Sequence, residues 1–134
     1  HVVNISSISG QIGTLNMAAY CASKFAMNGF SESRYHELKP LGIHVSIVCP
    51  GPVGTGFNRA FADIKPNSPP GLVIRPEAVS GAVMRILASK KFETVMPHWL
   101  ALICWFKRIA PNLFRAVAQR TFRRHVVGKE QHGI

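Results

Sequence analysis

Two short apolar segments on either side of a long helical segment constrain the fold of this 134-residue chain more than any other feature. Residues 1–6 are rich in Val and Ile and run into a turn of Ser and Gly, and residues 43–49 end at Pro50 and Gly51. Both segments are typical of buried strands. Residues 17–39 contain no Pro and a single Gly, and their apolar side chains recur at roughly helical spacing.

A strand, a helix of about twenty residues and a second strand form a right-handed βαβ crossover, which predicts a parallel sheet. Pro40 and Gly42 mark the end of the helix. Pro76 opens a further predicted helix that continues to about Ser89, and residues 93–96 predict a short third strand. The fold class is therefore expected to be α/β.

The composition fits a folded domain, because 47% of the residues are hydrophobic and only 16% are charged. A disordered chain would need the opposite balance. The sequence opens with His inside an apolar run, which indicates a segment of a longer protein, and no signal peptide fits this opening. The expected location is cytoplasmic, with the basic tail described below as a candidate for peripheral membrane contact.

Neither the cysteines nor the histidines form a recognisable site. Cys21, Cys49 and Cys104 are odd in number and widely spaced, so they match neither a disulfide framework nor a zinc site, and buried thiols are expected. The six His residues contain no pair at metal-ligand spacing. No metal site is predicted.

Tyr20 and Lys24 are four residues apart on the first predicted helix, so they project from one face about one turn apart. An ammonium beside a phenol stabilises the phenolate, which lets the phenol exchange protons nearer neutral pH. The spacing alone is weak, because a half-buried Tyr beside a solvated Lys occurs on many helices. The surrounding sequence makes it specific.

Three linked motifs supply that context. Residues 4–10 read Asn-Ile-Ser-Ser-Ile-Ser-Gly at the end of the first predicted strand, residues 20–24 read Tyr-Cys-Ala-Ser-Lys, and residues 50–55 read Pro-Gly-Pro-Val-Gly-Thr. In this order and spacing they resemble the short-chain dehydrogenase/reductase family, and the resemblance covers residues 1 to about 96. It implies the carboxyl-terminal half of a Rossmann-like, doubly wound parallel sheet.

The resemblance implies a role for each matched residue. Ser7 would hold the substrate carbonyl or hydroxyl oxygen, Tyr20 would donate or accept its proton, and Lys24 would assist Tyr20 and bind the nicotinamide ribose. Ser6 and Ser9 are alternatives for the serine role, and the separation of thirteen residues from Tyr20 favours Ser7.

The cofactor implied by the resemblance is NAD or NADP. Pro50, Gly51 and Val53 would line the nicotinamide side, and Val53 and Thr55 would offer groups to the carboxamide. The Gly-rich turn that seats the pyrophosphate, and the residue that distinguishes NAD from NADP, are absent here and would lie in an upstream half.

Residues 53–75 are rich in Pro, Gly and Asn and are too long for an ordinary connector, which indicates a lid over the substrate. In the family this region covers the substrate. The stretch from Phe57 to Leu72 contains Phe57, Phe61, Ile64 and Leu72, which indicate a lipid-like or ring-containing substrate, although ordinary loop packing explains them equally well.

Residues 97–134 are expected to form a basic, amphipathic helical tail. Nine of the 16 Lys and Arg residues lie in residues 90–134, and a helix over residues 112–127 separates an apolar from an Arg-rich face. Three interpretations remain open: a solvated or oligomer-packing helix, a nucleic-acid patch, and a helix lying on an anionic membrane. No nucleic-acid recognition motif is present, the apolar run at residues 99–106 is too short to span a bilayer, and two Trp with Arg favour the membrane surface.

These observations predict an NAD(P)(H)-dependent oxidoreductase that interconverts a ketone and a secondary alcohol when the protein is intact. Its expected organisation is a catalytic half at residues 1–96 followed by a tail at residues 97–134, and the intact protein is expected to be a homo-oligomer. The alternative is a catalytically inactive fragment whose sheet and amphipathic helix serve as an interaction module.

Overall fold

A parallel sheet with helices on both faces forms the first part of the molecule. The computed structural model describes residues 1–56 and 72–130, with the backbone alone for residues 122–130. The strands in the described residues are β1 (Val2–Ile5), β2 (Val45–Pro50) and β3 (Glu93–Met96), all parallel and in the order β1-β2-β3. Helix α1 (Ala18–Leu38) joins β1 to β2, and α2 (Pro76–Ser89) precedes β3. The predicted α/β class is confirmed.

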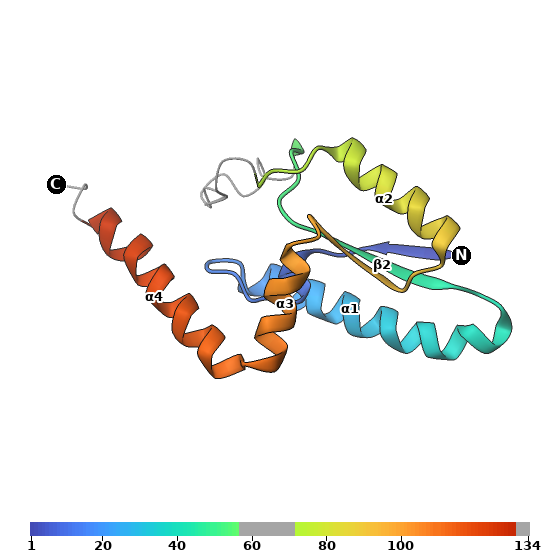
Figure 1. The fold of residues 1–134 in the computed structure, drawn as a ribbon, viewed down its shortest axis with the longest axis horizontal. Helices are drawn as coiled ribbons and strands as arrows, with labels where there is room; N and C mark the ends of the chain where they lie inside the picture. The colour runs from blue at the N-terminus through green and yellow to red at the C-terminus, as the bar shows by residue number, and fades with distance from the viewer. Residues whose placement is uncertain (57–71, 131–134) are drawn as a thin grey trace. The chain divides into compact units, whose positions relative to one another are not determined.

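Strand β2 lies at the centre of the sheet and is buried on both faces. On one face Val48 packs against Ala82 and Ile86 of α2, and on the other the Cys49 thiol lies 4.0 Å from the Asn28 side chain of α1. Figure 1 shows the two helices on opposite sides of the sheet. This helix–sheet–helix layering is Rossmann-like, as expected.

The end of α1 explains why β2 begins later than predicted. Gly42 adopts a left-handed φ of 75°, which glycine tolerates without a steric penalty, and its N–H binds the Lys39 carbonyl. The Ile43 N–H then binds the Leu38 carbonyl at 3.2 Å and so caps the helix. The strand therefore starts at Val45, two residues after the apolar run begins.

The carboxyl-terminal part consists of α3 (Leu100–Ile109) and α4 (Pro111–Glu130). The apolar run at residues 99–106 lies largely in α3, and the helix predicted at residues 112–127 is α4. The chain divides into two compact units, His1–Ala101 and Leu102–Ile134. Within the described residues, no helix combines the length and the apolar character that crossing a bilayer requires.

Candidate active site

Tyr20 and Lys24 lie in the first two turns of α1, at the end of the helix nearest to β1. Both side chains are half-buried. The Lys24 Nζ is 5.7 Å from the centroid of the Tyr20 ring, so the positive charge lies beside the phenol. Tyr20 and Lys24 therefore project from one face of α1, as their spacing predicted.

The Lys24 ammonium also reaches the sheet. Its Nζ donates a hydrogen bond of 3.1 Å to the carbonyl of Ile5, which is the last residue of β1. This bond places the charge at the carboxyl end of the strand, where parallel sheets bind ligands. It also uses one of the three ammonium hydrogens and leaves the others for further partners.

Ser7 lies just beyond the same strand end and begins a short 3-10 helix, η1 (Ile8–Gly10). Its Oγ accepts a hydrogen bond of 3.1 Å from the Ser9 N–H and donates one of 3.5 Å to the Pro50 carbonyl. The hydroxyl therefore links the carboxyl ends of β1 and β2. Only 7% of Ser7 is exposed, so its position is set by these neighbours.

The two alternative serines are buried as well. The Ser6 hydroxyl donates to the Lys24 backbone carbonyl at 3.4 Å, and the Ser9 hydroxyl lies 3.4 Å from the Thr14 hydroxyl. Both therefore bind groups of the local fold, whereas the Ser7 hydroxyl lies between the two strand ends. The assignment of Ser7 to the substrate stays a prediction.

Gly10 brings η1 close to α1. A Cβ at this position would lie 2.7 Å from the Lys24 carbonyl oxygen and 2.9 Å from the Asn28 Nδ2. The Asn28 Nδ2 also donates a hydrogen bond of 3.0 Å to the Gly10 carbonyl. Sequence reasoning included Gly10 only as the last residue of the Ser motif and did not single out Asn28, which stands one turn after Lys24.

The residues expected on the nicotinamide side continue from the end of β2. The Gly51 N–H binds the Met96 carbonyl at 2.6 Å, and Val53 forms an isolated parallel bridge with Ile74. A Cβ on Gly51 would lie 3.1 Å from the Leu100 Cδ1, so the glycine permits close packing there. Thr55 is exposed at the end of this segment.

A second Tyr-x-x-x-Lys pair occurs on the same helix. The Lys39 Nζ donates a hydrogen bond of 3.0 Å to the Tyr35 hydroxyl and lies 5.0 Å from its ring centroid. The Tyr35 ring packs on Phe92, which precedes β3, so this pair lies near the amino-terminal edge of the sheet. The spacing therefore recurs without the serine turn and the strand ends that surround Tyr20.

Other predicted features are resolved in part. Residues 57–71, which include Phe57, Phe61 and Ile64 of the expected lid, lie outside the described residues. All three cysteines are buried. Across the described part of the chain, no group of His, Cys, Asp and Glu side chains could hold a metal ion.

Residues 1–65 match the family model described as short chain dehydrogenase. Estradiol 17-beta-dehydrogenase 11 of Homo sapiens is 31% identical over 123 residues, which cover 90% of this chain and 39% of the relative. Epidermal retinol dehydrogenase 2 of Mus musculus is 35% identical over 114 residues, which cover 83% of this chain and 36% of the relative. The chain thus spans well under half the length of the curated relatives it matches.

Solved structures have the same fold. A short chain dehydrogenase from Burkholderia cenocepacia J2315 in complex with NADP superposes with a TM-score of 0.69 at 27% identity, covering 88% of this chain and 46% of that one. A short-chain dehydrogenase from Sphingobium yanoikuyae in complex with NADPH superposes with a TM-score of 0.63 at 25% identity. The superposition covers 82% of this chain and 44% of that one.

Proposed function

The chain belongs to the short-chain dehydrogenase/reductase family, and we propose that it forms the catalytic half of an oxidoreductase that interconverts a ketone and a secondary alcohol with NAD(P)(H). One observation carries the proposal. The Tyr20 phenol has the Lys24 ammonium beside it, and that ammonium is anchored at the carboxyl end of β1, two residues before Ser7.

Each of the three side chains has a part that its chemistry supports. The Ser7 hydroxyl orients the substrate oxygen by a hydrogen bond, and the Tyr20 hydroxyl donates a proton to that oxygen during reduction or accepts one during oxidation. The Lys24 ammonium stabilises the phenolate that remains after Tyr20 gives up its proton. Ser7 remains in place because its turn is buried.

The residues present fit a nicotinamide cofactor. Hydroxyl and ammonium donors gather where the carboxyl ends of β1 and β2 meet, which is the ligand edge of a parallel sheet. Lys24 would bind the ribose, and Pro50, Gly51, Val53 and Thr55 would lie along the nicotinamide. Bound there, NAD or NADP would supply or accept the hydride.

The proposed substrate is an apolar carbonyl compound or alcohol. Two observations support this class: relatives are named for estradiol and for retinol, both of which are largely hydrocarbon, and residues 57–72 contain four large apolar side chains. These residues would cover the substrate as a lid. A hydrophobic covering favours a substrate with a hydrophobic body.

A peripheral contact with an anionic membrane is the second part of the proposal. On α3, Leu102, Trp105 and Ile109 fall on one face at helical spacing, and each is more than 60% exposed. Lys107 and Arg108 lie in the last turn of the same helix. Exposed Trp and Leu beside basic side chains are typical of helices that lie in a membrane interface. A surface contact of this kind would bring the enzyme to apolar substrates.

Cofactor titration of the full-length protein tests the oxidoreductase proposal against the alternative of an inactive interaction module. We expect saturable binding of NADH or NADPH, followed by oxidation of the bound cofactor when an apolar ketone is added. A matched sample of residues 1–134 alone should bind more weakly, since the pyrophosphate-binding turn is absent from these residues. Absence of cofactor binding by both samples would reject the enzyme and favour the interaction module.

A further inference from the structure

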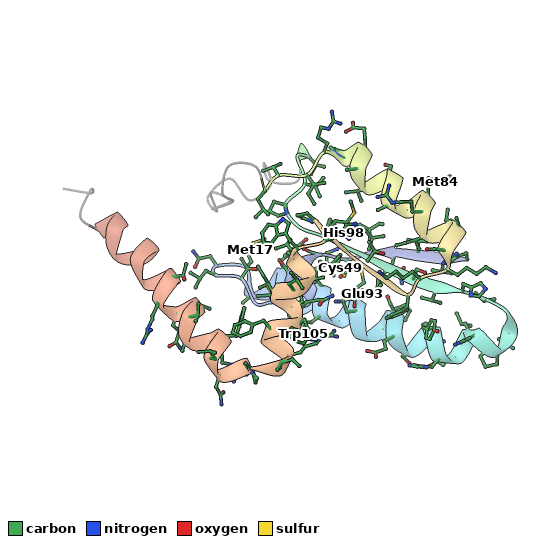
Figure 2. The ribbon with its side chains drawn as sticks, in the orientation of Figure 1. Met17, Cys49, Met84, Glu93, His98 and Trp105 are labelled. Atoms are coloured by element: carbon green, nitrogen blue, oxygen red, sulfur yellow. The ribbon has the colours of Figure 1, made fainter. Side chains whose placement is uncertain are left out.

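A polar cluster lies beneath the serine turn, on the α1 side of the sheet. The Gln11 Nε2 donates a hydrogen bond to the Glu93 Oε1 and lies 3.8 Å from the Cys49 Sγ. The Cys49 Sγ is also 3.9 Å from the Glu93 Oε1. Figure 2 shows Cys49 and Glu93 side by side. The three side chains come from η1's end, β2 and β3, which are far apart in the sequence.

Because the cluster is buried, its polar groups would destabilise the fold if they lacked hydrogen-bond partners. Cys49 is fully buried and Gln11 is 9% exposed. A buried amide without a hydrogen-bond partner destabilises a fold. Within the described residues Glu93 forms no ion pair, so its carboxylate is held by the Gln11 amide and the Cys49 thiol.

Gln11 ends the same turn that Ser7 begins. Ser7 is the N-cap of η1, and Gln11 is its C-cap, with its N–H bound to the Ile8 carbonyl at 2.9 Å. The turn is only three residues long, so the side-chain bonds at its two ends contribute to its position together with the Asn28–Gly10 hydrogen bond. At one end the Ser7 Oγ reaches the Pro50 carbonyl, and at the other the Gln11 amide reaches Glu93.

We propose that Glu93 is a positioning residue that fixes the Ser7 hydroxyl by holding Gln11 through the carboxylate–amide hydrogen bond. The inference rests on the proposed function, because it assigns to Ser7 the binding of the substrate oxygen. Glu93 itself touches no reacting group and acts from the first residue of β3. Removing its oxygens would take away the carboxylate that binds the Gln11 amide and so loosen this end of the turn, and a hydroxyl displaced by about 1 Å can lower turnover by about a hundredfold.

Hydrogen exchange in the full-length protein tests the positioning role without any assay of turnover. In Glu93→Ala, the Ser9 and Gln11 amides, which bond to the Ser7 Oγ and the Ile8 carbonyl, should exchange about tenfold faster than in the wild type, while α2 amides stay unchanged. Glu93→Gln keeps an oxygen acceptor for Gln11 and should restore most of the protection. Glu32→Ala removes an exposed carboxylate from α1 and is the matched control. Unchanged exchange at Ser9 and Gln11 in Glu93→Ala would overturn the proposal.

A double-mutant cycle tests whether Glu93 acts through Ser7. Glu93→Ala should lower kcat by ten- to a hundredfold in the wild-type background and have almost no further effect in Ser7→Ala, because the hydroxyl it positions is gone. If Glu93 had a merely structural role, the double variant would lose kcat by the product of the two single-variant factors. That result would reject the proposal. A wild-type protein without turnover would contradict the proposed function, and the exchange experiment would still decide the role of Glu93.

Discussion

Two tyrosines on α1 share the same spacing to a lysine, and only their surroundings differ. Tyr20 has a lysine that reaches the Ile5 carbonyl at the end of β1, whereas the Lys39 ammonium turns back to the Tyr35 hydroxyl itself. A phenol that already accepts its lysine's hydrogen bond, at the edge of the sheet opposite to the ligand edge, has no substrate to protonate. The Ser7 turn, rather than the four-residue spacing, is thus the reason for proposing Tyr20 as the proton-transfer residue.

Tyr20→Phe removes the hydroxyl that is proposed to transfer the proton and keeps the ring. In the full-length protein we expect turnover to fall at least a thousandfold while the affinity for NADH or NADPH stays within about twofold, because only the group that transfers the proton is lost. Steady-state kinetics and a fluorescence titration of the cofactor measure the two effects. Tyr35→Phe removes the chain's other phenol hydroxyl and should leave turnover unchanged. Retained activity in Tyr20→Phe would remove Tyr20 from its role.

At the scale of elements, the regular helices and strands were predictable because they depend on periodicity and on Pro and Gly signals. The predicted helix at residues 76–89 matches α2, and the predicted third strand matches β3. A turn was expected after β1 and a helical tail over residues 97–134, and α3 and α4 lie in that tail. The 3-10 geometry of η1 was not predicted, because a three-residue turn has no periodicity.

The close approach of η1 to α1 gives an element-scale prediction at Gly10. In Gly10→Ala the added Cβ would meet the Lys24 backbone carbonyl at 2.7 Å, which cannot shift without moving the helix. We expect the free energy of unfolding to fall by about 1–3 kcal/mol. Turnover should fall as well, because the Ser7 turn moves away from Tyr20.

Gly13→Ala is the matched control for this substitution. Nothing lies within 4 Å of a Cβ built at Gly13, which is in the loop that follows η1. Its midpoint of urea unfolding should therefore stay close to that of the wild type. Equal stability of the two alanine variants would show that η1 does not depend on close contact with α1.

At the scale of the whole molecule, the edge of the sheet that carries the candidate active site was predictable from the sequence, and the Gln11–Cys49–Glu93 cluster beneath it was not. The ends of parallel strands meet at one edge, so motifs that follow the two predicted strands were expected to lie together. Cys49 had been expected only to be buried, and Glu93 only to belong to a strand. Their contact with Gln11 depends on the pairing of β2 with β3 and on which strand face meets α1, and no local pattern encodes either.

The α3 stripe of Leu102, Trp105 and Ile109 supports a prediction about the location of the whole molecule. Vesicles containing phosphatidylserine should pellet the full-length protein at low salt, and neutral phosphatidylcholine vesicles should pellet it weakly, since the basic side chains attract anionic headgroups. High salt should reduce pelleting by screening that attraction. Trp105→Ser with Ile109→Ser should lower the pelleted fraction about fivefold, because the apolar contact with lipid is lost. Met84→Ser removes a similarly exposed apolar side chain from α2 and should pellet like the wild type. If the double variant pellets like Met84→Ser, α3 does not contact the membrane.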